Sequence, residues 1–327
     1  MKNKKIIIAG GTGFIGEEMI RYFGKNNHLV ILTRQMKNAL NNRNKYYSLS
    51  STDLANVQYV KWDGINTGDW VALIEGADIV INLAGKSVNC RYTPKNKQEI
   101  FDSRTDSVNA IGNAIRLCKN PPELWVNASS ATIYRNAVDR RQDEYTGEYH
   151  NDFSVQVCKK WEKALYEQET PYTRKVALRM AITLGPGGVL IPYFYLLKFG
   201  LGGRQGSGSQ MYSWVHAEDT CSMIAWLYEH KHLSGTFNCC SPNPVSNAEF
   251  MRLLRKATGH TFGLPAYEWM LKLGAPLIGT ETELVLKSRW VVPTKIIETG
   301  FQFKYPLLKD ALADIIRKVP RRQYHLF

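Results

Sequence analysis

Four glycines near the N-terminus occur at a spacing that can bind phosphate groups. They lie in the string Gly10-Gly-Thr-Gly13-Phe-Ile-Gly16, between an apolar β-branched run over Lys5–Ala9 and helical periodicity over Glu17–Lys25. Glycines permit a tight turn and a close approach of the backbone to a pyrophosphate, and the start of the following helix supplies unpaired N–H groups. Because strand, turn and helix follow in the required order, we predict a dinucleotide site. Its predicted contact residues in this turn are Gly10, Thr12, Gly13, Phe14, Ile15 and Gly16.

The end of the second strand-like run, His28–Thr33, indicates which dinucleotide is preferred. An NAD site usually carries Asp or Glu there to bind the ribose 2′-hydroxyl. This chain has Thr33 followed by Arg34, 18 positions after Gly16. A guanidinium can bind a 2′-phosphate, and no carboxylate stands there to repel it. We therefore predict NADP, with NAD as the weaker alternative, held by Thr33 and Arg34 with help from Lys37. The competing interpretation is a solvated surface arginine.

A sheet has to hold these residues at one edge, and the sequence contains the segments for it. Apolar segments alternate with segments of helical periodicity through the first half of the chain. The predicted strands are 5–9, 28–33, 57–62, 77–83, 124–128 and 174–180, and the clearest later helices are 95–118 and 153–168. This alternation predicts an α/β fold with a doubly wound parallel sheet, the NAD(P)-binding Rossmann arrangement.

The pattern changes after Gly185, where a glycine-rich loop at 200–209 and a tail with little strand follow. We expect residues 1–184 to form the NADP-binding Rossmann domain, to which residues 210–242 return. Residues 185–209 and 243–327 are expected to form a smaller, mostly helical substrate domain over the carboxyl ends of the strands.

Residues at further strand ends are expected to line the same crevice, because the carboxyl ends of parallel strands meet at one edge of a sheet. Asp63 follows the third strand and offers a carboxylate to an adenine amino group. Leu83, Ala84 and Gly85 end the fourth strand, where small residues let a cofactor lie against the backbone. Ser129 ends the fifth strand. Ordinary strand termination by turn residues is the alternative at each position.

Composition restricts the class of protein. With 327 residues, of which 44% are hydrophobic and 22% charged, the chain is of the globular kind and can bury a sizeable core. The longest apolar run, Val189–Leu197, is about half of the roughly 20 residues that a membrane helix needs. We expect no membrane association. The six cysteines lack metal-binding spacing, which predicts reduced thiols, a cytoplasmic protein and no metal site.

The net charge of +13 predicts an anionic partner. The basic residues are spread along the chain, and no nucleic-acid-binding motif is present. A small-molecule substrate or cofactor that carries negative charge is therefore favoured over nucleic acid, which we do not expect to be a partner.

Several ordered strings resemble the extended short-chain dehydrogenase/reductases, the group that contains nucleotide-sugar epimerases. These are the glycine turn, Asn82-Leu-Ala-Gly85, Ser129-Ser-Ala-Thr-Ile-Tyr134 and Val215-His216-Ala-Glu-Asp219. Five more strings are similar to an atypical subgroup, the "epimerase family" proteins sometimes labelled cell-division-inhibitor-like. They begin at Ile100, Cys158, Gly206, Pro242 and Gly300. The resemblance covers essentially the whole chain and implies a Rossmann domain, NADP binding and a C-terminal substrate domain. It also implies a possible homodimer, to which Ile111–Leu117 would contribute.

The chain departs from that group at its catalytic pair, Tyr-x-x-x-Lys on a helix. There the Lys lowers the pKa of the Tyr and holds the nicotinamide ribose. Of the 17 tyrosines, only Tyr305 has a Lys four residues later, and it lies outside the relevant helix. When Glu162 is matched to the common glutamate of that helix, Ser154 and Cys158 occupy the Tyr and Lys positions.

Replacement groups follow from the same comparison. Ser130 matches the serine that binds the reacting oxygen, and Tyr134 is a candidate replacement acid, with ordinary packing as its alternative. Lys159 is the candidate lysine if the alignment shifts by one residue, although one helical step turns a side chain by about 100°. Arg104, in the string that begins at Ile100, is assigned to the cofactor and anion site; a surface salt bridge is its alternative.

Two functions therefore stay open. The first is an NADP-dependent oxidoreductase or epimerase acting on a sugar-like or carbonyl substrate that is held beneath the C-terminal domain. The second is a catalytically inactive NADP(H)-binding regulatory or scaffold protein, since the Tyr-x-x-x-Lys pair is missing.

Overall fold

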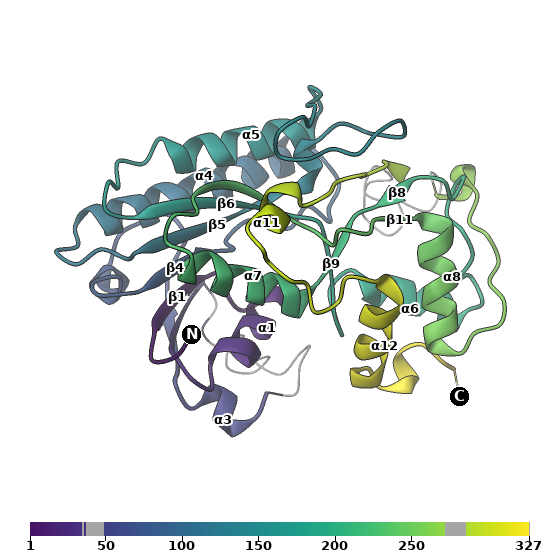
Figure 1. Cartoon of the computed structure of the whole chain (residues 1–327), viewed down its shortest axis with the longest axis horizontal. Coiled ribbons are helices and arrows are strands. Elements are labelled where there is room, and N and C mark those ends of the chain that lie inside the picture. The colour runs from purple at the N-terminus through teal and green to yellow at the C-terminus, as the bar shows by residue number, and fades with distance from the viewer. Residues whose placement is uncertain (35, 37–48, 272–285, 327) are drawn as a thin grey trace.

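The computed structural model describes residues 1–34, 36, 49–271 and 286–326, and its centre is a seven-stranded parallel sheet (Figure 1). The strands follow the order β10-β6-β5-β4-β1-β2-β3. They comprise β1 (Lys5–Ala9), β2 (His28–Thr33), β3 (Val57–Lys61), β4 (Ile79–Asn82), β5 (Leu124–Ser130), β6 (Arg174–Met180) and β10 (Gly235–Cys239). The predicted doubly wound Rossmann fold is confirmed.

Two layers of helices cover the sheet. The longer helices are α1 (Phe14–Phe23), α4 (Pro94–Arg116), α5 (Phe153–Tyr166) and α7 (Ala217–Glu229), and the shorter ones are α3 (Ser51–Leu54), η1 (Asp69–Leu73), η2 (Ala131–Ile133) and α11 (Thr294–Glu298). Because side chains alternate between the faces of a strand, Ile6 and Ile8 of β1 pack toward α1 and α7. Ile7 and Ala9 pack toward α4 and α5 on the other face.

The order of the strands creates a switch point between β1 and β4. From β1 the chain proceeds through β2 and β3 toward one edge, and from β4 through β5, β6 and β10 toward the other. The register places Ala9 of β1 beside both Leu32 of β2 and Asn82 of β4. The loops after these strands therefore diverge to opposite faces and leave a crevice at their carboxyl ends, where ligands bind in open α/β sheets.

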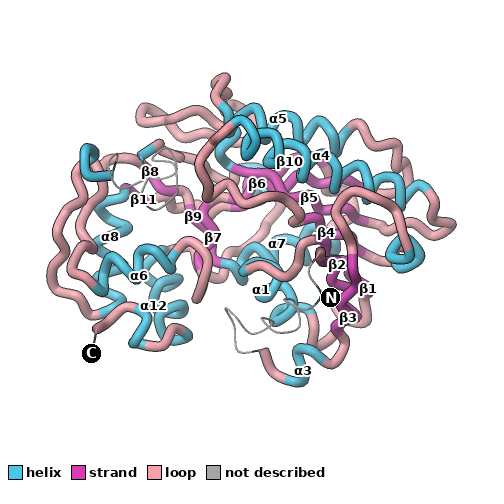
Figure 2. The backbone as a smooth tube through the Cα atoms, turned by 180° about the vertical axis from the view of Figure 1, so that it is seen from behind, coloured by secondary structure: helices cyan, strands magenta, loops and turns pink. Residues whose placement is uncertain are grey.

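A second group of helices and short strands lies beside the sheet (Figure 2) and encloses its own hydrophobic core. It is built from α6 (Leu190–Lys198), α8 (Asn247–Thr258), α12 (Leu308–Lys318) and η3 (Arg321–Gln323), together with two small sheets. One sheet pairs β7 (Ile182–Leu184) with β9 (Trp214–His216), and the other pairs β8 (Met211–Tyr212) with β11 (Val245–Ser246). This part is mostly helical, as the sequence indicates, while the exact domain boundaries stay a prediction.

The buried carboxylate of Asp219 joins α7 to the C-terminal part, and His216 caps the start of this helix. The carboxylate of Asp219 accepts hydrogen bonds from the backbone N–H groups of Lys304 and Tyr305, at 2.8 and 3.0 Å. Burial raises the pKa of Asp219 to about 6. His216 caps α7 by accepting from the Glu218 N–H at 3.1 Å, and burial lowers its pKa to about 4, so its ring is neutral near pH 7. Both residues act structurally here.

No helix among residues 1–34, 49–271 and 286–326 is both long and apolar enough to cross a membrane. In the same part of the chain, no three His, Cys, Asp or Glu side chains group in a way that could hold a metal ion. Within the predicted dimer segment, Ile111 and Ile115 are buried in the chain's own core and Leu117 is exposed. Dimerisation itself stays a prediction.

The connection that Asp219 makes between α7 and the C-terminal part can be tested with the substitution Asp219→Ala. The substitution leaves two backbone N–H groups without their acceptor, so we expect the free energy of unfolding to fall by about 2 kcal/mol or more. Urea unfolding followed by circular dichroism measures this. The matched control is Glu229→Ala on the same helix, whose exposed carboxylate pairs with the N-terminus and should change stability by less than about 0.5 kcal/mol. Equal effects of the two substitutions would contradict the assignment.

Candidate active site

The glycine turn after β1 is shaped by two close backbone approaches and one open position. Gly10 has φ +75°, and a Cβ on it would lie 2.9 Å from Cα of Ala84. A Cβ on Gly16 would lie 2.1 Å from the backbone oxygen of Gly11. Gly13 caps α1 without a side chain, and a Cβ there would meet no atom of the described residues within 4 Å. The packing therefore requires glycine at 10 and 16, while the space at 13 is free for a ligand.

The crevice next to β2 and β3 carries the predicted adenosine-binding residues. Thr33 is buried at the end of β2, and Arg34 is exposed directly after it. The Asp63 carboxylate accepts hydrogen bonds from the N–H groups of Ile65 and Asn66, both at 2.8 Å, and these bonds lower its pKa. The Asp63 carboxylate thus already stabilises a turn. To contact adenine as predicted, it would have to accept a further hydrogen bond beside these two. Lys37 lies outside the described residues.

A buried amide arranges the loop after β4. The side chain of Asn82 donates to Oδ1 of Asn127 at 2.8 Å and accepts from the N–H of Ala84 at 3.0 Å. These bonds tie the end of β4 to β5 and turn the following backbone toward the glycine turn. Gly85 comes next and lies against the side chain of Arg104, whose Cζ would be 3.2 Å from a Cβ at that position.

Ser130 lies at the carboxyl end of β5 among other small polar side chains. Its Oγ accepts hydrogen bonds from the N–H of Thr132 at 3.2 Å and from the hydroxyl of Thr132 at 3.0 Å. The Thr132 hydroxyl is also 3.5 Å from Sγ of Cys158 on α5. Burial raises the pKa of Cys158 to about 11, so the thiol is protonated at neutral pH and is a poor nucleophile. Ser130, Thr132 and Cys158 form one cluster.

Tyr134 and Ser129 both make buried hydrogen bonds to protein groups. Tyr134 is buried, and its hydroxyl donates to Oδ1 of Asn238 at 3.0 Å while it accepts from Nη1 of Arg179 at 2.8 Å. Burial also raises the pKa of this phenol well above its usual value. A phenol held in this way has neither access to the crevice nor a readily released proton, which argues against the predicted role of Tyr134 as the replacement acid. The Ser129 side chain is buried and donates to Glu162 at 2.6 Å.

The hydrogen bonds of Tyr134 and Ser129 belong to one buried network, whose centre is Arg179. The sequence analysis did not identify this arginine. Nε and Nη2 of Arg179 each lie 2.8 Å from one oxygen of Glu162, which makes a buried two-point ion pair. An arginine inside the apolar strand 174–180 was the available signal, since a buried cation requires a partner. Its partner on α5 is 17 residues away in sequence and could not be identified from spacing.

Lys159 is not placed with the Ser130 cluster. It is exposed on α5, with its ammonium 5.4 Å from the ring centre of Tyr149, while the preceding residue Cys158 faces Thr132. The rotation of about 100° per helical residue explains this difference. Lysine is therefore absent from the position that faces Ser130.

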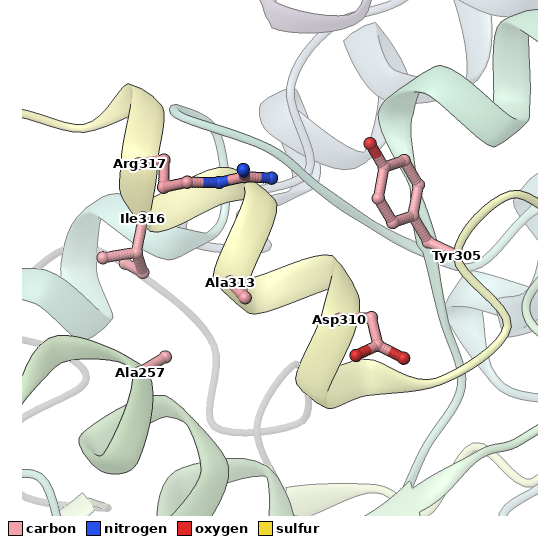
Figure 3. A pocket seen from close by; sticks show the side chains of 6 residues that line it. All are labelled: Ala257, Tyr305, Asp310, Ala313, Ile316 and Arg317. Carbon is pink, nitrogen blue, oxygen red and sulfur yellow. The ribbon is translucent and has the colours of Figure 1, made fainter.

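A separate hollow lies in the C-terminal part between α8 and α12 (Figure 3). It is lined by Ala257, Tyr305, Asp310, Ala313, Ile316 and Arg317. Arg317 already pairs with Asp314 at 3.3 Å, and the ring of Tyr305 packs at a tilt against that of His216, with 4.1 Å between the ring centres. The hollow contains no residue of the predicted site, so the strand-end crevice is the better candidate for chemistry.

Comparison with known proteins identifies the family of the chain. Residues 6–240 match the model of the NAD dependent epimerase/dehydratase family, and residues 268–315 match a domain of unknown function, DUF1731. The epimerase family protein YfhF of Bacillus subtilis is 31% identical over 95% of this chain and 97% of its own length.

Solved structures share the fold. The human epimerase family protein SDR39U1 (isoform 2), determined with NADPH, has a TM-score of 0.81 and 24% identity over 96% of this chain and 100% of its own. A UDP-N-acetylglucosamine 4-epimerase from Methanobrevibacter ruminantium, determined with UDP-N-acetylmuramic acid, has a TM-score of 0.73 and 17% identity over 97% of this chain and 98% of its own.

The two kinds of glycine in the turn should respond differently to the same added methyl group. Gly13→Ala should leave the melting temperature within a few degrees but weaken nucleotide binding about tenfold or more, because its Cβ enters only the ligand space. Gly16→Ala should lower the free energy of unfolding by about 2 kcal/mol or more through a clash with backbone. Thermal melts and fluorescence titration with NADPH measure both effects. Unchanged NADPH binding in a folded Gly13→Ala protein would contradict the assigned ligand space.

Proposed function

The chain belongs to the NAD dependent epimerase/dehydratase family, and we propose that it is an NADP(H)-dependent oxidoreductase or epimerase of the extended short-chain dehydrogenase/reductase type. The observation that carries this proposal is the placement of the glycine turn, Arg34 and Ser130 at the carboxyl edge of one parallel sheet, around the β1–β4 switch point. This edge is where a dinucleotide and a substrate would meet.

The preference for NADP(H) over NAD rests on Arg34. An exposed guanidinium directly after β2 suits a 2′-phosphate, which a carboxylate at this point would repel. The human relative that was determined with NADPH supports this choice. We propose that the pyrophosphate lies on the N-terminus of α1 over Gly13, and that Leu83, Ala84 and Gly85 lie along the cofactor between that point and Ser130.

Ser130 is proposed to bind the reacting oxygen of the substrate. Its Oγ accepts two hydrogen bonds from Thr132, so its own hydroxyl hydrogen remains available to donate to a carbonyl or alcohol oxygen. The nicotinamide, when bound, supplies hydride chemistry at that carbon. Thr132 orients the serine, and the protonated Cys158 thiol behind it adds no negative charge to oppose a developing oxyanion.

A sugar-like or carbonyl molecule that carries negative charge is the proposed substrate. Support comes from the net charge of +13 and from the fold shared with an epimerase determined with a nucleotide sugar. The proposed setting is the cytoplasm, since all six cysteines are free and four of them are buried. The substrate is expected to bind between the strand-end crevice and the C-terminal part.

One observation favours a second candidate, an NADP(H)-binding regulatory protein without catalysis. Ser154 and Cys158 occupy the positions of the group's Tyr and Lys on α5, and the hydroxyl of Tyr134 is held by Arg179 and Asn238. In this alternative the cofactor would bind in the same crevice, and the protein would respond to it by a change in conformation.

Replacement of Arg34 tests the cofactor assignment. We expect Arg34→Ala to weaken NADPH binding about tenfold or more and to leave the weaker NADH binding unchanged, because only NADPH carries the 2′-phosphate. Calorimetric or fluorescence titration measures both. Arg252→Ala, which removes an exposed arginine on α8 that pairs with Glu249, is the charge-matched control. Equal loss for both nucleotides would contradict the role of Arg34.

Replacement of Ser130 separates the enzyme from the inactive regulator. We expect slow oxidation of NADPH by at least one member of a panel of sugars and carbonyl compounds, reduced about a hundredfold in Ser130→Ala with NADPH affinity unchanged. Thr170→Ala, a hydroxyl deletion in the loop after α5, is a control for general effects of losing a hydroxyl. Oxidation that continues unchanged in Ser130→Ala would overturn the proposed role of this serine.

A further inference from the structure

Arg104 is a partly buried cation with an unusual set of partners. It lies on α4, and its Nη1 donates to the backbone oxygens of Lys86 and Ile100 at 3.1 and 2.9 Å. Its guanidinium carbon is 4.8 Å from the ring centre of Trp161 on α5. Within the described part of the chain it forms no ion pair with a carboxylate. Among the described residues, its positive charge is stabilised only by the two backbone carbonyls and by the face of the Trp161 ring.

Most of the hydrogen-bonding capacity of this guanidinium is unused. An arginine has five N–H donors, and the two carbonyls account for those on Nη1. Nε is buried without a partner, and the Nη2 donors also have no acceptor among the described residues. Burial lowers the pKa of Arg104, yet an arginine keeps its charge in proteins. A partly buried cation whose Nε is enclosed without a partner is costly to leave unpaired, which indicates a ligand that offers oxygen atoms.

The position of Arg104 places it between the two ends of the proposed cofactor site. Gly10 of the phosphate turn touches Ala84, and the neighbouring Gly85 lies directly against the Arg104 guanidinium. On its other side, the Arg104 guanidinium lies over the ring of Trp161, which follows Cys158 by three residues on α5. Cys158 in turn contacts Thr132, the partner of Ser130. A ligand that extends from the phosphate turn to Ser130 must therefore pass the guanidinium.

We propose that Arg104 supplies, from α4, the positive charge that α5 lacks at position 158, and that its free N–H donors bind the nicotinamide-ribose half of the cofactor. The inference rests on the proposed function, since it assigns a role within that same site. The planar guanidinium presents neighbouring donors that match the paired hydroxyls of a ribose or the oxygens of a phosphate. Cys158 at the position of the group's lysine leaves this charge to be provided from elsewhere.

The experiment uses three probes that share the 2′-phosphate but differ in length. Adenosine 2′,5′-bisphosphate ends before the pyrophosphate, 2′-phospho-ADP-ribose adds the pyrophosphate and second ribose, and NADPH adds the nicotinamide. We expect Arg104→Gln to weaken NADPH and 2′-phospho-ADP-ribose binding about tenfold or more, and to leave adenosine 2′,5′-bisphosphate within about twofold. The Gln amide can still donate to the Lys86 oxygen, which preserves the loop.

Ser103→Ala is the matched control for a purely structural role. Ser103 also ties this loop to α4, because its Oγ accepts from the Lys86 N–H at 2.8 Å, but it carries no charge. We expect this variant to bind all three probes like the original protein. Arg104→Lys provides a milder second variant, because it keeps the charge but loses the planar donors, and it should show the same probe-selective loss to a smaller degree.

The outcomes separate this inference from the proposed function. If the original protein binds NADPH and Arg104→Gln binds it equally well, or loses all three probes equally, the inference is overturned and the proposed function stands. If the original protein binds none of the probes, both the role of Arg104 and the proposed function are overturned. A positive charge at position 158 of α5 should compensate for the charge lost at position 104. We therefore expect Cys158→Lys, added to Arg104→Gln, to recover part of the NADPH affinity. If the double variant folds but does not recover NADPH affinity, the charges at positions 104 and 158 do not act at the same part of the cofactor, which contradicts the inference.

Discussion

The close approach of the first strand's glycine turn to the loop after the fourth strand determines the geometry of the whole candidate site. Gly10 can lie against Ala84 because it has no Cβ and because its φ of +75° is open to glycine. The contact exists only because β1 and β4 are neighbours at the point where the strand order reverses. A side chain at residue 10 would separate the two loops and with them the phosphate turn and the Gly85–Arg104 contact.

A second constraint fixes the helix that carries the altered catalytic positions. The buried pair of Glu162 and Arg179 connects α5 to β6, and Ser129 joins the pair from β5. Tyr134 and Asn238 extend the network to β10. A buried ion pair of this kind specifies an arrangement more than it adds net stability, so we regard it as the element that sets the rotation of α5. That rotation directs Cys158 toward Ser130 and Lys159 toward solvent.

The sequence was sufficient to predict the architecture and insufficient to predict the inner polar partners. Strand runs such as 28–33 and 174–180 agree with β2 and β6, because apolar β-branched segments between helices have few alternatives in an α/β fold. Ser129 and Ser130 show the limit of such reasoning. Adjacent residues of a strand face opposite sides, and only the folded sheet shows that Glu162 and Arg179 occupy the side of Ser129. The hydrogen-bond partners of Tyr134, which are Arg179 and Asn238, likewise become visible only in the folded chain.

The second core has a consequence for the order in which the protein can fold during synthesis. Its buried side chains come from segments that are far apart in the chain, including Leu184, Trp214, Phe250, Leu312 and Tyr324. The parallel sheet is complete once β10 has emerged from the ribosome, at Cys239. The apolar faces of helix α6 and the small sheets, by contrast, stay exposed until α12 has been synthesised, about 70 residues later. At translation rates of roughly 5–20 residues per second, this interval of several seconds is the period in which a nascent chain of this protein is most open to chaperones.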